Sequence, residues 1–225
     1  MTKEEVCARI EEFGIIPAIR LASNEDARFA AQALYRAGLP IAEITMTVPG
    51  ALDLISELLR DFPDIVVGAG TVLDAETARR AVDAGARFIT STGIDISVVG
   101  LAVEEGVLAL PGALTPTEII NAWKAGADFV KVFPCTTLGG DSYIRAVKAA
   151  LPQIRLIAGG GVQQHTAGHY ITAGASAIGV GKELITQEAI RLRKSEWILE
   201  LAHRFMGIVK NARAHTASAN VVTFK

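Results

Sequence analysis

The sequence predicts one α/β domain folded as a closed (β/α)8 TIM barrel, and three observations carry this prediction. Short, apolar, β-branched segments alternate with helical segments at a period of roughly 20–25 residues, and eight such units can be counted. An Ala-Gly or Glu-Gly step recurs at the ends of the helices, immediately before the next strand. No Pro/Gly/Ser-rich linker divides residues 1–225. Eight parallel strands with right-handed crossovers favour a closed barrel over about residues 15–212.

The elements follow one another in a regular order. Residues 3–13 carry apolar side chains at helical spacing and end at Gly14, which predicts a short leading helix. The eight predicted strands are 15–20, 41–45, 65–69, 87–90, 107–110, 127–133, 154–158 and 176–180. The alternative is an open, doubly wound sheet, but the chain has no Gly-x-Gly-x-x-Gly fingerprint.

Capping signals mark the helices between these strands. Ser23 and Asp74 precede two helical segments as N-caps, Pro49 is expected to start a third, and residues 115–118 (Thr-Pro-Thr-Glu) resemble a capping box. A long final helix is predicted over about residues 187–212. Residues 213–225 form a tail beyond the last unit, for which the sequence leaves open both a mobile segment and packing on a neighbour.

Composition excludes several classes of protein. Half the residues are hydrophobic and the net charge is -2, with no Lys/Arg-rich run, which argues against nucleic-acid and acidic-membrane binding. No apolar run reaches the roughly 18 residues of a membrane span, and the first residues are charged. The two cysteines, Cys7 and Cys135, form neither a disulfide framework nor a zinc motif. We expect a cytoplasmic protein without a metal or cofactor.

One strand contains an unexpected charge. Residues 127–133 read Ala-Asp-Phe-Val-Lys-Val-Phe, so alternation places Phe129, Lys131 and Phe133 on one face. Burial disfavours an ammonium group and favours a neutral amine, which can attack a carbonyl carbon. A lysine held by a buried carboxylate is the structural alternative.

Other polar side chains lie at the carboxyl ends of strands, where barrel enzymes place their chemistry. Arg20 ends the first strand, Glu43 lies in the second, and Thr71 follows the third. Taken singly, Arg20 is explained as a solvent-reaching side chain, Glu43 as an ion-pair partner of Lys131, and Thr71 as a loop hydroxyl. Together, the long charged side chains of Arg20, Glu43 and Lys131 nevertheless favour an active site inside the barrel. Removing three charges from water for a purely structural purpose would be costly.

Glycines after the last two strands predict an anion site. Residues 159–161 (Gly-Gly-Gly) and 179–181 (Gly-Val-Gly) expose backbone N–H groups near helix N-termini, and barrels commonly bind phosphate there. Lys182 either adds a cation to that site or points to solvent. His165 and His169 share a helical face without a third metal ligand, and Cys135 has no neighbouring base in the sequence.

These segments resemble those of the bacterial 2-keto-3-deoxy-6-phosphogluconate (KDPG) aldolase family, which includes 2-keto-3-deoxy-6-phosphogalactonate and 4-hydroxy-2-oxoglutarate aldolases. The matching motifs are 16–20 (Ile-Pro-Ala-Ile-Arg), 43–49 (Glu-Ile-Thr-Met-Thr-Val-Pro), 68–72 (Gly-Ala-Gly-Thr-Val), 111–112 (Pro-Gly), 130–134 (Val-Lys-Val-Phe-Pro) and 160–162 (Gly-Gly-Val). The resemblance covers about residues 3–212.

The resemblance implies a class I, metal-independent aldolase, which is a lyase of carbohydrate metabolism and usually a homotrimer. Lys131 would form the Schiff base with the pyruvate unit and Glu43 would move protons through a water. Arg20 and Thr71 would hold the pyruvate carboxylate. The remaining residues expected to bind substrate are Pro111, Phe133, Gly160, Gly161, Gly181 and Lys182.

The sequence departs from the family pattern in ways that concern the substrate. Many members carry an arginine soon after the catalytic glutamate, where this chain has Met46 and Thr47. By analogy with other branches of the family, Arg20 is expected to substitute for that arginine. The expected substrate is KDPG or a close relative. Two other functions stay open: a sugar-phosphate isomerase or epimerase that uses Lys131 as an electrostatic stabiliser, and a non-catalytic trimeric barrel protein.

Overall fold

The structure, a computed structural model, describes residues 1–222 and the side chains of residues 1–216. Its nine strands form one sheet in the order β5-β4-β3-β2-β1-β9-β8-β7-β6, and every neighbouring pair is parallel. The strands are β1 (Ile15–Ile19), β2 (Ile41–Thr45), β3 (Val66–Gly70), β4 (Phe88–Thr90), β5 (Leu108–Leu110), β6 (Gly112–Ala113), β7 (Val130–Val132), β8 (Leu156–Gly159) and β9 (Ala177–Val180).

The predicted fifth strand, 107–110, corresponds to β5, and the chain forms a further short strand, β6, directly after it. Pro111 separates them, because proline has no N–H to donate to the ladder. The carbonyl of Ala109 accepts a hydrogen bond from the N–H of Asp128 (3.0 Å), and the carbonyl of Pro111 accepts from the N–H of Lys131 (2.9 Å). Both pieces therefore lie along the chain that forms β7, and the sheet closes on itself. The (β/α)8 barrel is confirmed, and the open-sheet alternative is wrong.

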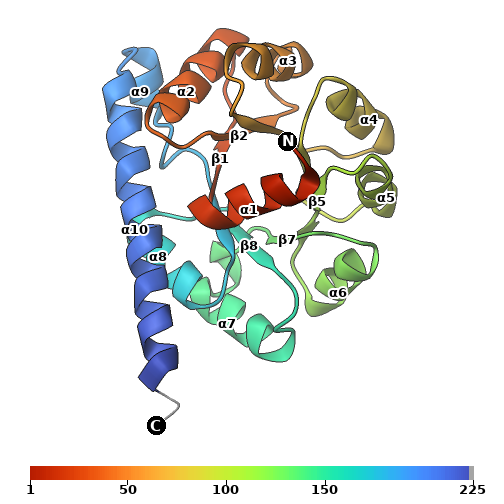
Figure 1. Ribbon diagram of the computed structural model, residues 1–225, viewed down its shortest axis with the longest axis vertical. Coiled ribbons are helices and arrows are strands. Elements are labelled where there is room, and N and C mark those ends of the chain that lie inside the picture. Colours follow the sequence, from red (N-terminus) through yellow and green to blue (C-terminus); the bar gives the residue numbers. More distant parts are fainter. Residues whose placement is uncertain (223–225) are drawn as a thin grey trace.

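A ring of helices surrounds the strands (Figure 1). The helices between strands are α2 (Asn24–Arg36), α3 (Ala51–Asp61), α4 (Ala75–Asp83), α5 (Ile96–Glu104), α6 (Pro116–Lys124), α7 (Asp141–Ala150) and α8 (Gln164–Thr172), with a short 3-10 turn η1 (Thr136–Leu138) before α7. The predicted N-caps at Ser23, Asp74 and Thr115 are confirmed. Pro49 does not start α3, because Gly50 is the N-cap of this helix.

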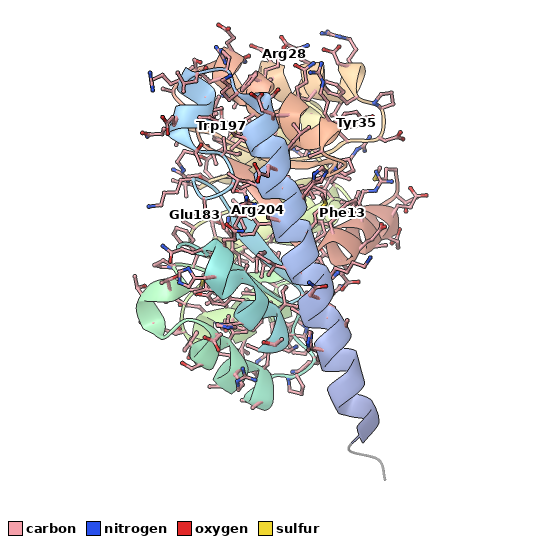
Figure 2. All side chains as sticks on the ribbon, turned by 90° about the vertical axis from the view of Figure 1, so that its left-hand side faces the viewer. Phe13, Arg28, Tyr35, Glu183, Trp197 and Arg204 are labelled. Carbon is pink, nitrogen blue, oxygen red and sulfur yellow. The ribbon has the colours of Figure 1, made fainter. Side chains whose placement is uncertain are left out.

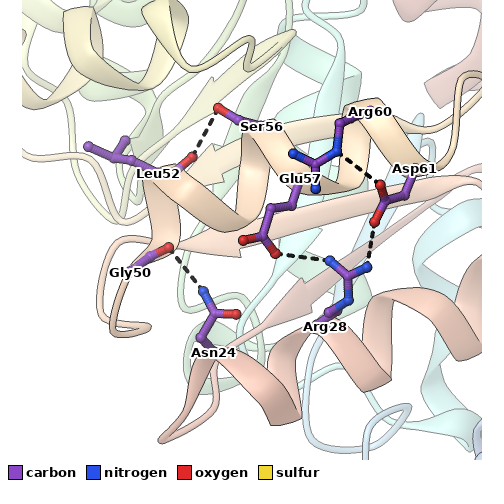
Figure 3. Close-up of polar contacts among 8 residues, drawn as sticks. All are labelled: Asn24, Arg28, Gly50, Leu52, Ser56, Glu57, Arg60 and Asp61. Atoms are coloured by element: carbon purple, nitrogen blue, oxygen red, sulfur yellow. Dashed lines mark hydrogen bonds and ion pairs between the residues drawn. The ribbon is translucent and has the colours of Figure 1, made fainter.

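Adjacent helices of the ring are also joined by polar contacts, as between α2 and α3 (Figure 3). The guanidinium of Arg28 on α2 donates to Glu57 (2.9 Å) and to Asp61, both on α3. At the other end, the side-chain amide of Asn24 donates to the carbonyl of Gly50 (3.2 Å). Exposed ion pairs of this kind contribute only about 0–1 kcal/mol each. They fix the spacing of the two helices more than they stabilise the fold.

Alternation along the strands creates two hydrophobic cores. The larger core lies between the strands and the surrounding helices. The smaller core fills the barrel interior and is built from Val6, Ile10, Ile16, Ile41, Val66, Phe88, Leu108, Leu110, Phe129, Ile157 and Ala177. The inner core includes two residues of α1 (Lys3–Phe13), which lies across the end of the barrel where the strands begin (Figure 1). The predicted leading helix therefore closes the bottom of the barrel and leaves the opposite end open.

The last helix differs from its prediction. Residues 187–212 are not one helix: α9 (Gln187–Arg191) ends before Arg193, and α10 (Ser195–Val222) then continues past residue 212. Arg193 has a left-handed backbone (φ 51), and its guanidinium pairs with Glu25 (2.8 Å) and Asp26 (2.9 Å) and lies over Phe29. Figures 1 and 2 show α10 along the outside of the barrel, extending beyond it at its C-terminal end.

The predicted tail is therefore helical up to residue 222, and residues 223–225 lie outside the described part of the chain. None of the helices within residues 1–222 is long and apolar enough to cross a membrane.

Candidate active site

Lys131 occupies the centre of the site because β7 alternates between the two cores. Val130 and Val132 point into the outer core, Phe129 packs in the inner core, and Lys131 therefore points into the barrel. The strand is shorter than predicted, spanning three residues instead of seven. The alternation that was predicted from the sequence holds, and the lysine is only 8% exposed.

Two neighbouring strands supply the partners of this lysine. Its Nζ donates to Glu43 on β2, at 3.3 Å from Oε1 and 3.2 Å from Oε2. It also donates to the hydroxyl of Thr90 on β4 at 3.3 Å. Glu43 and Thr90 are 3% and 1% exposed, so the whole cluster is withdrawn from bulk solvent. Charge-assisted hydrogen bonds in such surroundings are strong and hold the amine in one place.

Glycines on the inward face make room for these side chains. A Cβ atom on Gly70 would lie 2.3 Å from Glu43 Oε1, and one on Gly159 would lie 3.0 Å from Lys131 Cε. Larger residues at these positions would displace the carboxylate or the lysine stem. Neither Gly70 nor Thr90 is among the site residues predicted from the sequence. Alternation along residues 88–90, which places Phe88 and Thr90 on one face, is a signal that points to Thr90.

Arg20 and Thr71 lie together at the mouth of the barrel. Arg20 follows the last residue of β1 and is exposed, and its guanidinium donates to the hydroxyl of Thr71 (2.9 Å). Thr71 follows β3 with a left-handed backbone (φ 59), a conformation that is costly for a β-branched residue. The chain holds this hydroxyl beside the arginine in spite of the cost, which is a feature typical of functional sites.

The glycine turn after β8 packs closely on the segment that follows β7. Gly160 (φ 82) and Gly161 (φ 91) both have positive φ angles. A Cβ atom on Gly160 would lie 2.8 Å from the Phe133 ring, and one on Gly161 would lie 2.5 Å from the hydroxyl of Thr136. Only glycine allows the backbone of this turn to lie so close to Phe133 and Thr136. Packing therefore requires glycine at these two positions, whether or not a ligand binds there.

A cavity of about 630 Å³ connects these groups. Its lining includes nine of the residues predicted from the sequence: Arg20, Glu43, Thr71, Lys131, Phe133, Gly160, Gly161, Gly181 and Lys182. Pro111 does not line this cavity; it contributes its carbonyl to the backbone of Lys131 instead. Residues outside the predicted substrate-binding set also line it, among them Thr92, Thr136, Gln163 and Glu183.

Beneath the glycine turn lies a small polar cluster. Cys135 is fully buried, and burial raises the pKa of its thiol. The hydroxyl of Thr136 lies 3.1 Å from that of Tyr170, whose pKa burial raises to about 12. Cys135 and Tyr170 therefore stay protonated at neutral pH, and the thiol is a poor nucleophile.

The histidines lie away from this site. His165 and His169 are exposed on α8. Among the residues that the structure describes, no group of three or more His, Cys, Asp or Glu side chains is arranged to hold a metal ion.

The fold and the site together define a class of protein. A buried lysine amine, held by a carboxylate inside a (β/α)8 barrel and open to a cavity with an arginine at its mouth, is the arrangement of a Schiff-base lyase. The family model described as KDPG and KHG aldolase matches residues 6–201. The chain belongs to this family of aldolases.

Individual relatives agree with this assignment. The chain is 33% identical to a 2-dehydro-3-deoxy-phosphogluconate aldolase of Treponema pallidum, over 72% of this chain and 77% of the relative. It is also 33% identical to a probable 2-dehydro-3-deoxy-6-phosphogalactonate aldolase of Rhizobium meliloti, over 76% and 81% of the two chains. A crystal structure of the KDPG aldolase of Legionella pneumophila, with pyruvate captured as a covalent carbinolamine, has a TM-score of 0.82 and 27% identity, and covers 90% of this chain and 97% of that one.

Proposed function

We propose that this protein is a class I aldolase that reversibly cleaves a 2-keto-4-hydroxy acid to pyruvate and an aldehyde, with KDPG or a close relative as substrate. The observation that carries the proposal is the Lys131–Glu43 pair, buried in the barrel and facing the cavity. The carbinolamine captured in the Legionella relative supports the same chemistry.

The first half of the mechanism forms a covalent intermediate on Lys131. Glu43 takes a proton from the ammonium, and the neutral amine attacks the C2 keto carbon of the substrate. Glu43 returns this proton to the departing hydroxyl, so the resulting carbinolamine loses water and becomes an iminium, and Glu43 is again a carboxylate. Arg20 binds the substrate carboxylate through its guanidinium, and the hydroxyl of Thr71 adds a second donor. Fixing the carboxylate orients the keto carbon towards Nζ.

The second half breaks the carbon–carbon bond. The iminium withdraws electrons from the C3–C4 bond, while Glu43 takes the C4 hydroxyl proton through a water molecule. The aldehyde leaves, the electron pair of the broken bond forms a C2=C3 double bond, and the C2=N π pair returns to Nζ, which gives a neutral enamine. Protonation at C3 restores the iminium, and water then releases pyruvate and the free lysine.

The distal end of the substrate lies, in this proposal, against the loops after β8 and β9. The backbone of Gly160, Gly161 and Gly181 and the ammonium of Lys182 line that part of the cavity. Backbone N–H groups near the start of α8 and a lysine suit a phosphate. Relatives with gluconate-type and galactonate-type names are both 33% identical to this chain, so acids of both configurations are candidate substrates.

Reduction with borohydride tests the proposal. Pyruvate and borohydride added to the protein are expected to leave a stable pyruvyl adduct, which peptide mapping places on Lys131. Lys131→Arg keeps the charge without an equivalent nucleophile and is expected to abolish both the adduct and pyruvate release. If the wild-type protein forms no adduct and instead exchanges solvent hydrogen into a sugar phosphate, the isomerase alternative replaces this one.

A panel of substrates defines the specificity. Phosphorylated and unphosphorylated 2-keto-3-deoxy acids and 4-hydroxy-2-oxoglutarate are compared by pyruvate release. Glu43→Gln is expected to lower turnover by roughly 10²–10⁴-fold on the best substrate, because general acid–base catalysis typically contributes that much. An unchanged turnover number would remove Glu43 from the mechanism.

We also propose that residues 1–225 form one domain, and that the protein is a cytoplasmic homotrimer. The inner core shared by α1 and the strands supports one domain. The two free cysteines suit a reducing compartment, and the family resemblance supports a trimer. Sedimentation equilibrium tests the trimer, which is expected to have three times the 23.8 kDa mass of the chain.

A further inference from the structure

Thr90 is a buried threonine whose hydroxyl accepts a hydrogen bond from the reactive amine. It ends β4, is 1% exposed, and its Oγ1 lies 3.3 Å from Lys131 Nζ. Within the described part of the chain this is the only hydrogen bond of its side chain. Such a threonine either has a structural role, in which it only accepts a hydrogen bond from the ammonium, or it takes part in the reaction.

Counting hydrogens on the nitrogen separates these two roles. A lysine ammonium has three N–H bonds, and the site offers three acceptor atoms within 3.3 Å: the two oxygens of Glu43 and the hydroxyl of Thr90. An iminium nitrogen has only one N–H bond. After the Schiff base forms, Glu43 and Thr90 therefore compete for a single hydrogen.

The outcome of that competition matters for Glu43. A carboxylate that stays paired with the iminium N–H is held beside the nitrogen and is a weaker base, because the positive charge stabilises its ionised form. The proton transfers at C3 and at the C4 hydroxyl need the same carboxylate. If another group accepts the hydrogen bond from the iminium N–H, the Glu43 carboxylate is free to carry out these proton transfers.

We propose that Thr90 is a catalytic hydrogen-bond acceptor that takes the single N–H of the iminium and thereby leaves Glu43 available for proton transfer. This inference rests on the proposed aldolase function. The same hydrogen bond fixes rotation about the Cε–Nζ bond and so sets the plane of the iminium. The C3–C4 bond breaks fastest when it is perpendicular to that plane, so the contact also aligns the reacting orbitals.

The test uses exchange of the pyruvate methyl hydrogens with deuterated water, followed by NMR. This exchange needs the Schiff base and a base at C3, but no aldehyde. Thr90→Val has nearly the same shape without the hydroxyl, and Thr90→Ser keeps the hydroxyl. Thr90→Val is expected to form the borohydride-trapped adduct on Lys131 but to exchange about 10- to 100-fold more slowly, the range that corresponds to loss of one hydrogen bond to a charged group. Thr90→Ser is expected to stay within about threefold of the wild type.

Thr45→Val is the matched control, because it also removes a buried threonine hydroxyl from a barrel strand. Thr45 donates to the carbonyl of Ile19 (3.1 Å) and contacts neither Lys131 nor Glu43 through a hydrogen bond. It is expected to lower thermal stability without slowing the exchange. If Thr90→Val proves insoluble, Thr90→Cys gives the same comparison with a weak acceptor.

The possible results are distinguishable. A wild-type protein without an adduct overturns the proposed function itself. A wild-type adduct, together with exchange in Thr90→Val as fast as in the wild type, overturns only the role of Thr90. Equal slowing in Thr90→Ser and Thr90→Val also overturns it, because the hydroxyl would then not be the group that matters.

Discussion

At the scale of single residues, the site depends both on the charged side chains that point into the barrel and on the glycines beside them, which have no side chain. Glu43 and Lys131 lie in the barrel interior, and glycines on β3 and β8 leave the space that their side chains occupy. The carboxylate therefore has one position, set by the lysine on one side and by the bare backbone of Gly70 on the other. A methyl group at Gly70 occupies the place of the carboxylate.

Gly70→Ala is expected to lower turnover by roughly 10- to 100-fold, because a displacement of about 1 Å in a catalytic group can cost that much. The new Cβ would lie 2.3 Å from Glu43 Oε1, so the carboxylate must move away. Steady-state pyruvate release measures the effect. Gly68→Ala on the same strand is the control: its Cβ would lie 2.2 Å from the ring of Phe88, so it is expected to lower the melting temperature instead. Full activity in Gly70→Ala would contradict the arrangement described.

The sequence predicted part of this site. Lys131, Glu43 and Thr71 could be found because charged or polar groups stand out in apolar strands or directly after them, and alternation then assigns their side. Thr90 does not stand out, because a threonine at the end of a strand is ordinary. The break between β5 and β6 was not predicted; it falls at Pro111, whose missing N–H interrupts the hydrogen-bond ladder.

At the scale of elements, local capping signals predicted most helix starts and ends, but they missed the break in the last helix. The N-caps at Ser23, Asp74 and Thr115 satisfy free N–H groups within a few residues, so the signal is contained in the local sequence. The break between α9 and α10 has no such signal. Arg193 has a left-handed conformation at this break, and its guanidinium pairs with residues at the start of α2, which are far away in the sequence.

The leading helix α1 is expected to contribute to the stability of the barrel without contributing to catalysis. Ile10 is fully buried in the inner core at the closed end of the barrel, away from the cavity. Ile10→Ala is expected to lower the free energy of unfolding by about 2–5 kcal/mol, the usual cost of such a cavity. KM and kcat are expected to stay within about twofold of the wild type, because the active-site end is unchanged.

Glu12→Ala serves as the control for this helix, since the Glu12 side chain is exposed on the same element. Its effect on the free energy of unfolding is expected to stay within about 0.5 kcal/mol, as for most surface substitutions. Urea denaturation followed by circular dichroism measures both variants. Equal stability of Ile10→Ala and the wild type would show that α1 does not support the barrel.

At the scale of the whole molecule, closure of the sheet joins the first and last parts of the chain. β1 pairs with β9, so residues 15–17 lie beside residues 178–180. Helix α10 packs against both α8 and α2, and Arg213 on α10 donates to the carbonyls of Glu12 (2.7 Å) and Ser176 (2.9 Å). The eightfold repeat of the sequence predicted this closure. The packing of α10 against α8 and α2 was not predicted, because it depends on long-range contacts that the repeat does not contain.

The inner core gives a whole-molecule prediction, because it takes residues from α1 and from strands on every side of the barrel. No half of the barrel can unfold without exposing apolar surface of the other half, so the proposed single domain is expected to unfold in one cooperative transition. The two tryptophans can report on this unfolding transition, because Trp123 lies on α6 and Trp197 on α10.

The test uses the single-tryptophan variants Trp197→Phe and Trp123→Phe. In each variant, fluorescence follows the region around one tryptophan, while circular dichroism follows all helices. For each variant the urea midpoints from the two probes are expected to agree within about 0.2 M, given a dependence of stability on urea of a few kcal/mol per molar. A fluorescence midpoint for either tryptophan that is clearly separated from that of circular dichroism would mean that α6 and α10 belong to units that unfold independently, and the chain would then have two domains.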